Sequence, residues 1–225
     1  MTLTFNEETH EYRLDGELVP SVSELLRPIT SEQFAAISPE VLRIAAERGT
    51  EVHEICQSID YGLDIDPAEA TPDVWGYVEA YQQFLYDHAV EWYGIEEMGA
   101  CTDFPVDYAG TVDRWGMVDG KLAVVDIKTV AQPSIEQKIA VTLQTYMYDW
   151  MVGEKHDTTI EKIYALYLKK DGDYTLMDCD EFASKEKMTP FAFIHDLMAL
   201  YLKEREIKDK VHEIKERHRR KKKDE

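Results

Sequence analysis

The chain has 225 residues, of which 44% are apolar and 31% are charged, and its formal net charge at pH 7 is −20. This length suits one α/β domain with a substantial core. The sequence contains no run of about 18 apolar residues, so we expect no membrane span. The acidic excess argues against generic nucleic-acid binding, which needs cations that displace counterions from phosphates. The start of the chain lacks the pattern of a secretory signal, and its three cysteines are scattered, so we expect a cytoplasmic protein.

The predicted elements of the first half begin with strands. Residues 3–20 alternate in polarity around an Asp15-Gly16 turn signal, which predicts a hairpin, and a short helix follows from Ser21 or Ser23. Ser38 before Pro39 predicts a helix that begins at 39 and ends near 59. We expect a further helix over about 73–89 and then a strand over 90–99.

The second half shows two more turn signals and one strong helix start. Asp119-Gly120 predicts a hairpin turn between two apolar strands over 110–129. Ser134 and Gln137 form a capping-box pattern at the start of a helix that reaches about residue 151. Asp171-Gly172 predicts another hairpin, and the chain is expected to be helical from about 184. This order predicts an α/β fold in which helices flank a central mixed β-sheet.

The hairpin over 110–129 brings two carboxylates together. A two-residue turn at Asp119-Gly120 places Asp113 opposite Asp126, and Lys128 shares a face with Asp126. Opposed carboxylates repel each other, so one of them could be protonated, Lys128 could neutralise part of the charge, or a divalent cation could lie between them. The alternative without a ligand is an exposed hairpin end with a surface salt bridge.

Four motifs occur in a fixed order along the chain: "YRLDGELVPSVSELL" (12–26), "ERGTEVHE" (47–54), "GTVD" followed by "DIK" (110–128), and "QTYMY" (144–148). Together they resemble the PD-(D/E)XK nuclease superfamily in its RecB-type branch, as found in small phage and bacterial members. The resemblance covers about residues 10–150. It implies a restriction-endonuclease-like core and a metal-dependent DNA exonuclease of phage or bacterial DNA recombination or repair.

Alternatives with the same sequence features remain open. One is a structure-selective or nicking endonuclease of the same fold, and another is a non-catalytic acidic protein that acts as a DNA mimic or assembly platform. We expect one nuclease domain over 1–202, with the N-terminal hairpin and helices over 1–90 and the catalytic core over about 90–180. Residues 203–225 are expected to form a charged helix with a basic tail.

The resemblance assigns roles to individual residues. The residues implied in catalysis are Asp113, Asp126, Lys128, Gln144 and Tyr148. The ligands implied for Mg²⁺ or Mn²⁺ are His53, Asp113, Asp126, the main-chain carbonyl of Ile127, and Glu97 in preference to its neighbour Glu96. Arg48 and Arg114 are expected to contact DNA. Members with an iron–sulfur cluster use four cysteines and this chain has three, so we expect no cluster.

The expected partners follow from the charge distribution and the resemblance. The segment from Lys203 to Glu225 contains 11 basic and 7 acidic residues and is therefore net positive on an acidic body. An acidic enzyme must concentrate its few cations near DNA, and a homo-oligomer, the basic tail or a DNA-binding partner would achieve this. The resemblance implies a single-strand annealing protein as one such partner.

Overall fold

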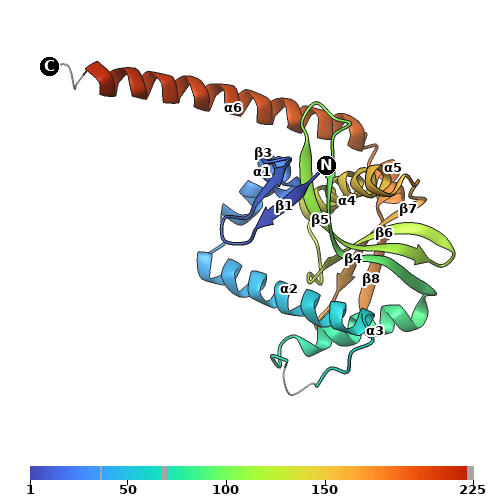
Figure 1. Cartoon of the computed structure of the whole chain (residues 1–225). Coiled ribbons are helices and arrows are strands. Elements are labelled where there is room, and N and C mark those ends of the chain that lie inside the picture. Colours follow the sequence, from blue (N-terminus) through green and yellow to red (C-terminus); the bar gives the residue numbers. More distant parts are fainter. Residues whose placement is uncertain (36, 67–69, 222–225) are drawn as a thin grey trace.

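The computed structural model describes residues 1–35, 37–66 and 70–221 and shows a sheet with helices on both of its sides (Figure 1). The five strands of this sheet lie in the order β4 (Val90–Cys101), β5 (Tyr108–Val118), β6 (Lys121–Lys128), β7 (Lys162–Leu168) and β8 (Tyr174–Asp178). β6 and β7 pair in parallel and the other neighbours are antiparallel. The prediction of an α/β fold with a central mixed sheet flanked by helices is confirmed.

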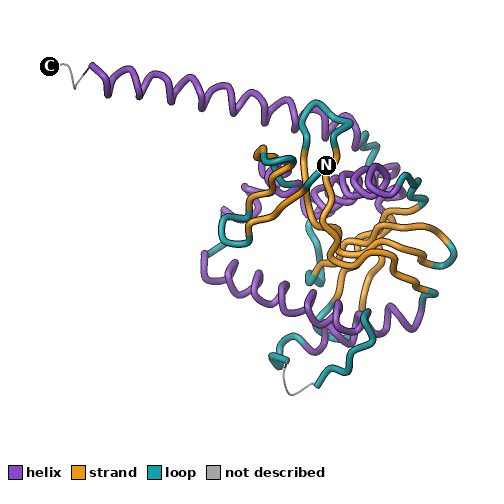
Figure 2. Tube along the Cα trace, in the orientation of Figure 1, coloured by secondary structure: helices purple, strands orange, loops and turns teal. Residues whose placement is uncertain are grey.

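Two groups of helices cover the two faces of this sheet, as Figure 2 shows. The helices α2 (Pro39–Asp60) and α3 (Trp75–Asp87) cover one face, and their buried side chains pack with Val125 of β6. The other face carries α1 (Val22–Ala35), α4 (Ile135–His156), α5 (Cys179–Lys185) and the start of α6 (Pro190–Lys221). Val124 packs on this second face, because successive side chains of a strand point to opposite sides.

The central hairpin has the turn and register that the sequence predicts. Asp119 and Gly120 adopt left-handed conformations with φ of 51° and 76°, as a type I′ turn requires. The ladder runs from Val118 opposite Lys121 to Arg114 opposite Val125. The strands therefore arrive at Asp113 and Asp126 in the predicted alignment.

The N-terminal segment differs from the single hairpin predicted for it. It forms a three-stranded sheet of β1 (Leu3–Asn6), β2 (Glu11–Leu14) and β3 (Glu17–Val19). The Asp15-Gly16 turn joins β2 and β3, as expected, but a second turn separates β1 from β2. The Asn6 side chain accepts hydrogen bonds from the main-chain N–H groups of Glu8 and Thr9, which forms this extra turn.

Local capping signals set several helix ends. Ser38 accepts a hydrogen bond from the N–H of Val41 at the start of α2, and Ser134 forms the predicted capping box at the start of α4. α4 continues past residue 151 to His156, where Asp157 adopts a left-handed conformation. The helix that begins after Ser21 is α1, which is 14 residues long rather than short.

The C-terminal part contains two helices, α5 and α6, where one helix was expected. Lys187 has a positive φ of 54° between them, and Pro190 begins α6. The predicted charged helix is present up to residue 221, and the last four residues of the basic tail, 222–225, lie outside the described residues. No helix within the described parts of the chain has the length and apolar character that crossing a membrane requires.

Candidate metal centre

The ladder between β5 and β6 ends where the predicted acidic residues begin. Beyond the last pair, Asp113 Oδ2 accepts a hydrogen bond from the N–H of Ile127 at 2.7 Å, so a side chain replaces a main-chain acceptor. The side chains of β5 also stop alternating between the two faces of the sheet here. Val112 and Trp115 are three positions apart and yet pack into the same core. Asp113 consequently places its carboxylate where the two strands separate, with 11% of the side chain exposed.

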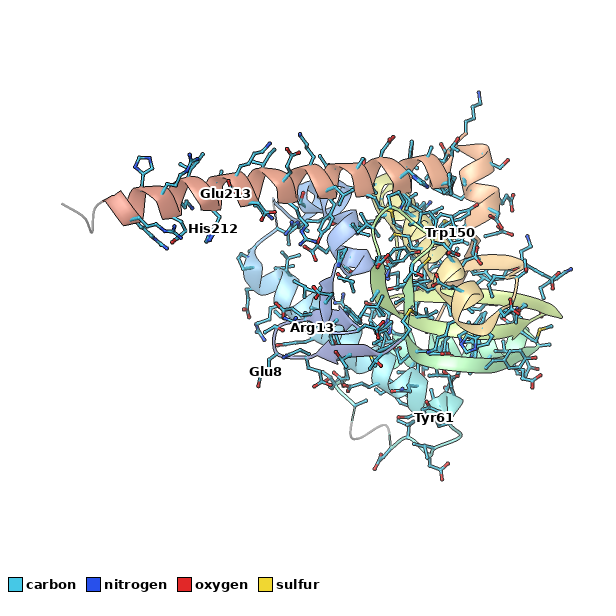
Figure 3. The ribbon with its side chains drawn as sticks, turned by 45° about the horizontal axis from the view of Figure 1, so that its top comes forward. Glu8, Arg13, Tyr61, Trp150, His212 and Glu213 are labelled. Carbon is cyan, nitrogen blue, oxygen red and sulfur yellow. The ribbon has the colours of Figure 1, made fainter. Side chains whose placement is uncertain are left out.

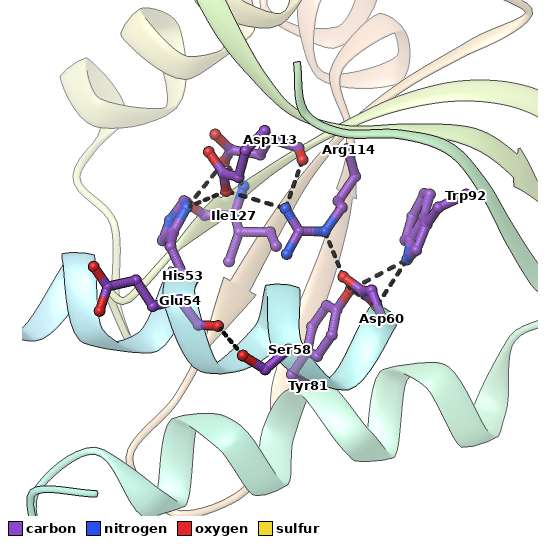
Figure 4. Close-up of polar contacts among 10 residues, drawn as sticks. His53, Glu54, Ser58, Asp60, Tyr81, Trp92, Asp113, Arg114 and Ile127 are labelled. Atoms are coloured by element: carbon purple, nitrogen blue, oxygen red, sulfur yellow. Dashed lines mark hydrogen bonds and ion pairs between the residues drawn. The ribbon is translucent and has the colours of Figure 1, made fainter. Parts of the chain in front are cut away.

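Three side chains from different elements converge on this point. Ligand atoms of His53 in α2, Glu96 in β4 and Asp113 in β5 all lie within 4.8 Å of one another. His53 Nδ1 is 3.2 Å from Glu96 Oε1 and 3.9 Å from Asp113 Oδ2, and His53 Nε2 is 3.1 Å from the carbonyl oxygen of Ile127. Figure 4 shows the imidazole extending from α2 towards Asp113 and Ile127. A pocket of about 470 Å³, lined by residues of α2 and by Glu96, borders the group.

The charge of His53 responds to these neighbours. Burial opposes protonation of the ring, but the carboxylates of Asp113 and Glu96 outweigh burial and raise the pKa of His53 to about 9. At neutral pH both ring nitrogens therefore carry a proton. The imidazolium donates to Glu96 and to the Ile127 carbonyl, and so links an acidic side chain to the end of β6.

The second predicted acidic residue forms a separate pair. Asp126 is fully buried, and Lys128 Nζ lies 2.7 Å from its Oδ2. Burial raises the pKa of Asp126 to about 6, with Asp113 adding to this effect and Lys128 opposing it. Burial opposes the charge of Lys128, but Asp126 and Asp113 raise its pKa, so the ammonium remains charged. Neutralisation by Lys128 is one of the three expected ways to tolerate the two carboxylates, and the structure contains this ion pair.

Two residues of α4 lie on the other side of the carboxylates. Gln144 Nε2 donates a hydrogen bond to the hydroxyl oxygen of Tyr148 at 2.8 Å. Burial, followed by the charges of Asp113 and Asp126, raises the pKa of Tyr148 well above its usual value. Tyr148 also borders a pocket of about 310 Å³ between β5 and the N-terminal sheet. The structure thus brings together the predicted residues of α2, β5, β6 and α4.

The preference for Glu97 over Glu96 is corrected by the structure. Glu97 accepts a hydrogen bond from Trp115 Nε1 at 2.5 Å and forms ion pairs with two basic residues of α4, on the face of the sheet away from His53. Glu96 points into the candidate centre instead. The choice depends on the pairing of β4 with β5, and the sequence carries no clear signal for the register shift that occurs near Trp92.

Arg114 is not placed to contact DNA, because its side chain is completely buried. Its Nε donates to Asp60 Oδ2 at 2.6 Å, and its Nη1 donates to Glu96 Oε1 at 3.0 Å and to the carbonyl of Asp113 at 2.6 Å. Asp60 also accepts hydrogen bonds from Tyr81 and Trp92, and Figure 4 shows these side chains around it. Sequence reasoning missed this network, although an arginine within a largely apolar strand already indicated a buried partner.

Arg48, the other residue expected to contact DNA, packs beside an aromatic ring. Its guanidinium carbon is 5.4 Å from the centre of the Tyr77 ring, so the side chain packs towards α3. The neighbouring Gly49 faces the end of β6, where an added Cβ would lie 3.9 Å from Thr129 Oγ1. Arg114, by contrast, lies close to His53, because Arg114 Nη1 and His53 Nδ1 contact the same oxygen of Glu96. The expectation that Arg48 contacts DNA stays a prediction.

Comparisons with known proteins give little guidance. No protein-family model matches the chain, and no curated protein matches it. The crystal structure of SSO0001 aligns with 78% of this chain and 84% of that chain, at 15% sequence identity and a TM-score of 0.32. A likeness this weak carries no argument about fold or function.

Proposed function

We propose that the chain is a metal-dependent DNA exonuclease with a restriction-endonuclease-like core. The observation that supports this most is the meeting of two groups where β5 and β6 separate. One is the His53–Glu96–Asp113 cluster, and the other is the buried Asp126–Lys128 pair. Hydrolysis of a phosphodiester needs acidic ligands for a cation and a positive group for the phosphate, and these two groups supply both.

The cluster suits a divalent cation. Its donors are two carboxylates and one imidazole with all ligand atoms within 4.8 Å, and the Ile127 carbonyl lies 3.1 Å from the same imidazole. Oxygen donors favour Mg²⁺ or Mn²⁺, and the nitrogen donor shifts the preference towards Mn²⁺. When bound, such an ion lowers the pKa of water and polarises the phosphate. His53 must release a proton to act as a ligand.

The chain's own residues would bind and orient the substrate. Lys128 keeps its charge beside the buried Asp126 and is one-third exposed, so its ammonium can meet a phosphate oxygen. Its raised pKa fits the stabilisation of negative charge better than the removal of a proton from water. On α4, Gln144 orients the hydroxyl of Tyr148 by a hydrogen bond. Within the sheet, Arg114 orients the carboxylate of Glu96 by another.

We also propose the substrate of this activity and the compartment in which it acts. DNA of a phage or bacterium undergoing recombination or repair is the proposed substrate, and the cytoplasm is the proposed location. The three cysteines are free and buried, which fits a reducing compartment. Because the net charge is −20, we expect a homo-oligomer or a partner such as an annealing protein to assist DNA binding.

The test compares end-labelled linear duplex DNA with covalently closed circular DNA, each incubated with the full chain and Mn²⁺. Release of labelled nucleotides from linear DNA without cutting of circles is the expected result. Cleavage of the circular DNA would show that the protein is an endonuclease and not an exonuclease. Inertness towards both substrates, alone and with an annealing protein, would refute the proposal and favour a non-catalytic acidic protein.

Variants link the activity to the candidate centre. Asp126→Ala and Lys128→Ala should each abolish cleavage, with circular dichroism confirming that the fold is retained. Lys138→Ala, at a residue of α4 that lines a pocket elsewhere on the molecule, is the matched control and should cleave normally. Normal turnover by either Asp126→Ala or Lys128→Ala would show that the centre is assigned wrongly.

A further inference from the structure

The helix α6 has two apolar faces, and the body covers one of them. Its first turns pack onto the body through three buried residues, which are Ile194, Leu197 and Met198. Further along, five aliphatic side chains are 42% to 53% exposed, and four of them lie on one face of the helix, namely Leu200, Ile207, Val211 and Ile214. We call these four residues the apolar seam. Their spacings of seven, four and three residues are those of a coiled-coil interface in which Glu204 occupies the core position between Leu200 and Ile207. Glu204 forms an ion pair of 3.7 Å with Arg27 of α1.

Beyond Glu204, the seam points away from the body. Successive residues of an α-helix are rotated by about 100°, so the seam lies roughly 120° around α6 from the buried stripe. Figure 3 shows the second half of α6 projecting from the molecule, with His212 and Glu213 far from the sheet. Within the described residues, the side chains of 202–215 are all exposed.

Basic residues border the seam on both sides. In the heptad that places Ile207 at position d, the flanking e and g positions hold Lys203, Lys208, Lys210, Lys215 and Arg217. The acidic residues of the same segment lie mainly on the opposite face of the helix, and these are Glu206, Asp209, Glu213 and Glu216. Within the described part of the chain, Lys215 and Arg217 take part in none of the ion pairs formed along α6.

We propose that α6 binds an acidic amphipathic helix of a partner protein through the apolar seam, forming a two-stranded coiled coil. The partner helix would place aliphatic residues against the seam and glutamates against its basic borders. Residues at e and g positions set partner choice in coiled coils, and opposite charges there favour pairing. This inference is independent of the proposed nuclease activity.

Other occupants fit these features less well. In a second copy of α6, lysine and arginine would face lysine and arginine in both parallel and antiparallel pairs, which opposes self-association. Phosphates of DNA would pair with the cations but would leave the aliphatic seam in water. A membrane surface favours a wide apolar face with aromatic residues, whereas the seam is narrow and aliphatic.

The experiment uses the full chain and two fluorescent peptides of about three heptads, identical except for Glu or Lys at the e and g positions. Fluorescence anisotropy should show that the acidic peptide binds at least about tenfold more tightly than the basic one. Ile207→Ser with Ile214→Ser should weaken binding of the acidic peptide by at least about tenfold. Asp209→Ser, on the opposite face, is the control and should bind like the wild-type chain.

Charge reversal provides a second measurement that does not depend on the seam variants. Lys208→Glu with Lys215→Glu should bind the basic peptide more tightly than the acidic one. Equal binding of both peptides, or no effect of charge reversal, would overturn the proposal. So would a dimer of the chain that is lost with Ile207→Ser. The proposal would also be overturned if the chain did not bind the acidic peptide but bound duplex DNA or phosphatidylserine vesicles, and if Ile207→Ser with Ile214→Ser removed that binding.

Discussion

Replacement of Asp126 by asparagine should stabilise the metal-free protein while abolishing the proposed activity. Burial raises the pKa of this carboxyl from 3.8 to about 6, so the folded state binds its proton more tightly than the unfolded chain does. The charged carboxylate therefore destabilises the fold at high pH, and this effect decreases as the pH falls from about 6 towards 4. Linkage gives a destabilisation of about 3 kcal/mol at pH 8 and a clearly smaller one at pH 5.

Asparagine removes this destabilisation but also removes the partner of Lys128. The attraction to Lys128 already enters the pKa of Asp126, and the Lys128 side chain is 33% exposed, so its ammonium can turn to water when the pair is lost. Asp126→Asn should consequently raise the free energy of unfolding by about 3 kcal/mol at pH 8 and by clearly less at pH 5. The corresponding rise in Tm at pH 8 is about 6–12 °C.

Urea denaturation in EDTA, followed by circular dichroism at both pH values, measures these differences. Asp149→Asn is the matched control, because burial raises the pKa of Asp149 to about 7 at a position on α4 outside the candidate centre. It should also stabilise the protein at pH 8, but it should leave DNA cleavage unchanged. A variant Asp126→Asn that is less stable than the wild-type chain at pH 8, or a gain that does not decrease at pH 5, would refute the reasoning.

Three further predictions concern the ligands and their support. Calorimetry should show that Glu96→Gln weakens Mn²⁺ binding by at least about tenfold while Glu97→Gln leaves it unchanged, and equal effects would contradict the placement of Glu96. Because the pKa of His53 is about 9, Mn²⁺ should bind about tenfold more weakly for each pH unit below 9 and release a proton, and His53→Gln should remove this pH dependence. Arg114→Met should lower the free energy of unfolding by about 3–5 kcal/mol, because Asp60 would be left buried without its cation; urea denaturation that shows a loss below about 1 kcal/mol would exclude this role.

Local signals in the sequence predicted much of the centre. Asp119-Gly120 sets the turn, the turn sets the register, and the register aligns Asp113 with Asp126. Each of these steps depends on neighbours within about 15 residues of one another. The positions of the helices that supply His53 and Tyr148 came from capping patterns and from the motif order, although the roles of these residues stay predictions.

Long-range pairing explains what the sequence did not predict. The choice between Glu96 and Glu97 depends on how β4 aligns with β5 across an irregular connection and a shift in register. The burial of Arg114 depends on Asp60, which is 54 positions away at the end of α2. Neither relation leaves a periodic pattern in the sequence. The extra turn after β1 was missed for another reason, because the side chain of Asn6 forms it and no Asn-Gly or Asp-Gly pair marks it in the sequence.

The helix α2 is tied to the sheet at two points, through His53 to the end of β6 and through Asp60 to Arg114. These residues are seven positions apart, so the anchors are separated by about 10 Å along the helix axis. A helix held at two such points can neither roll nor slide freely. The two contacts therefore hold the His53 imidazole in position beside the carboxylates. Loss of the Asp60–Arg114 ion pair would let α2 move and would change the position of His53, although Asp60 does not contact His53.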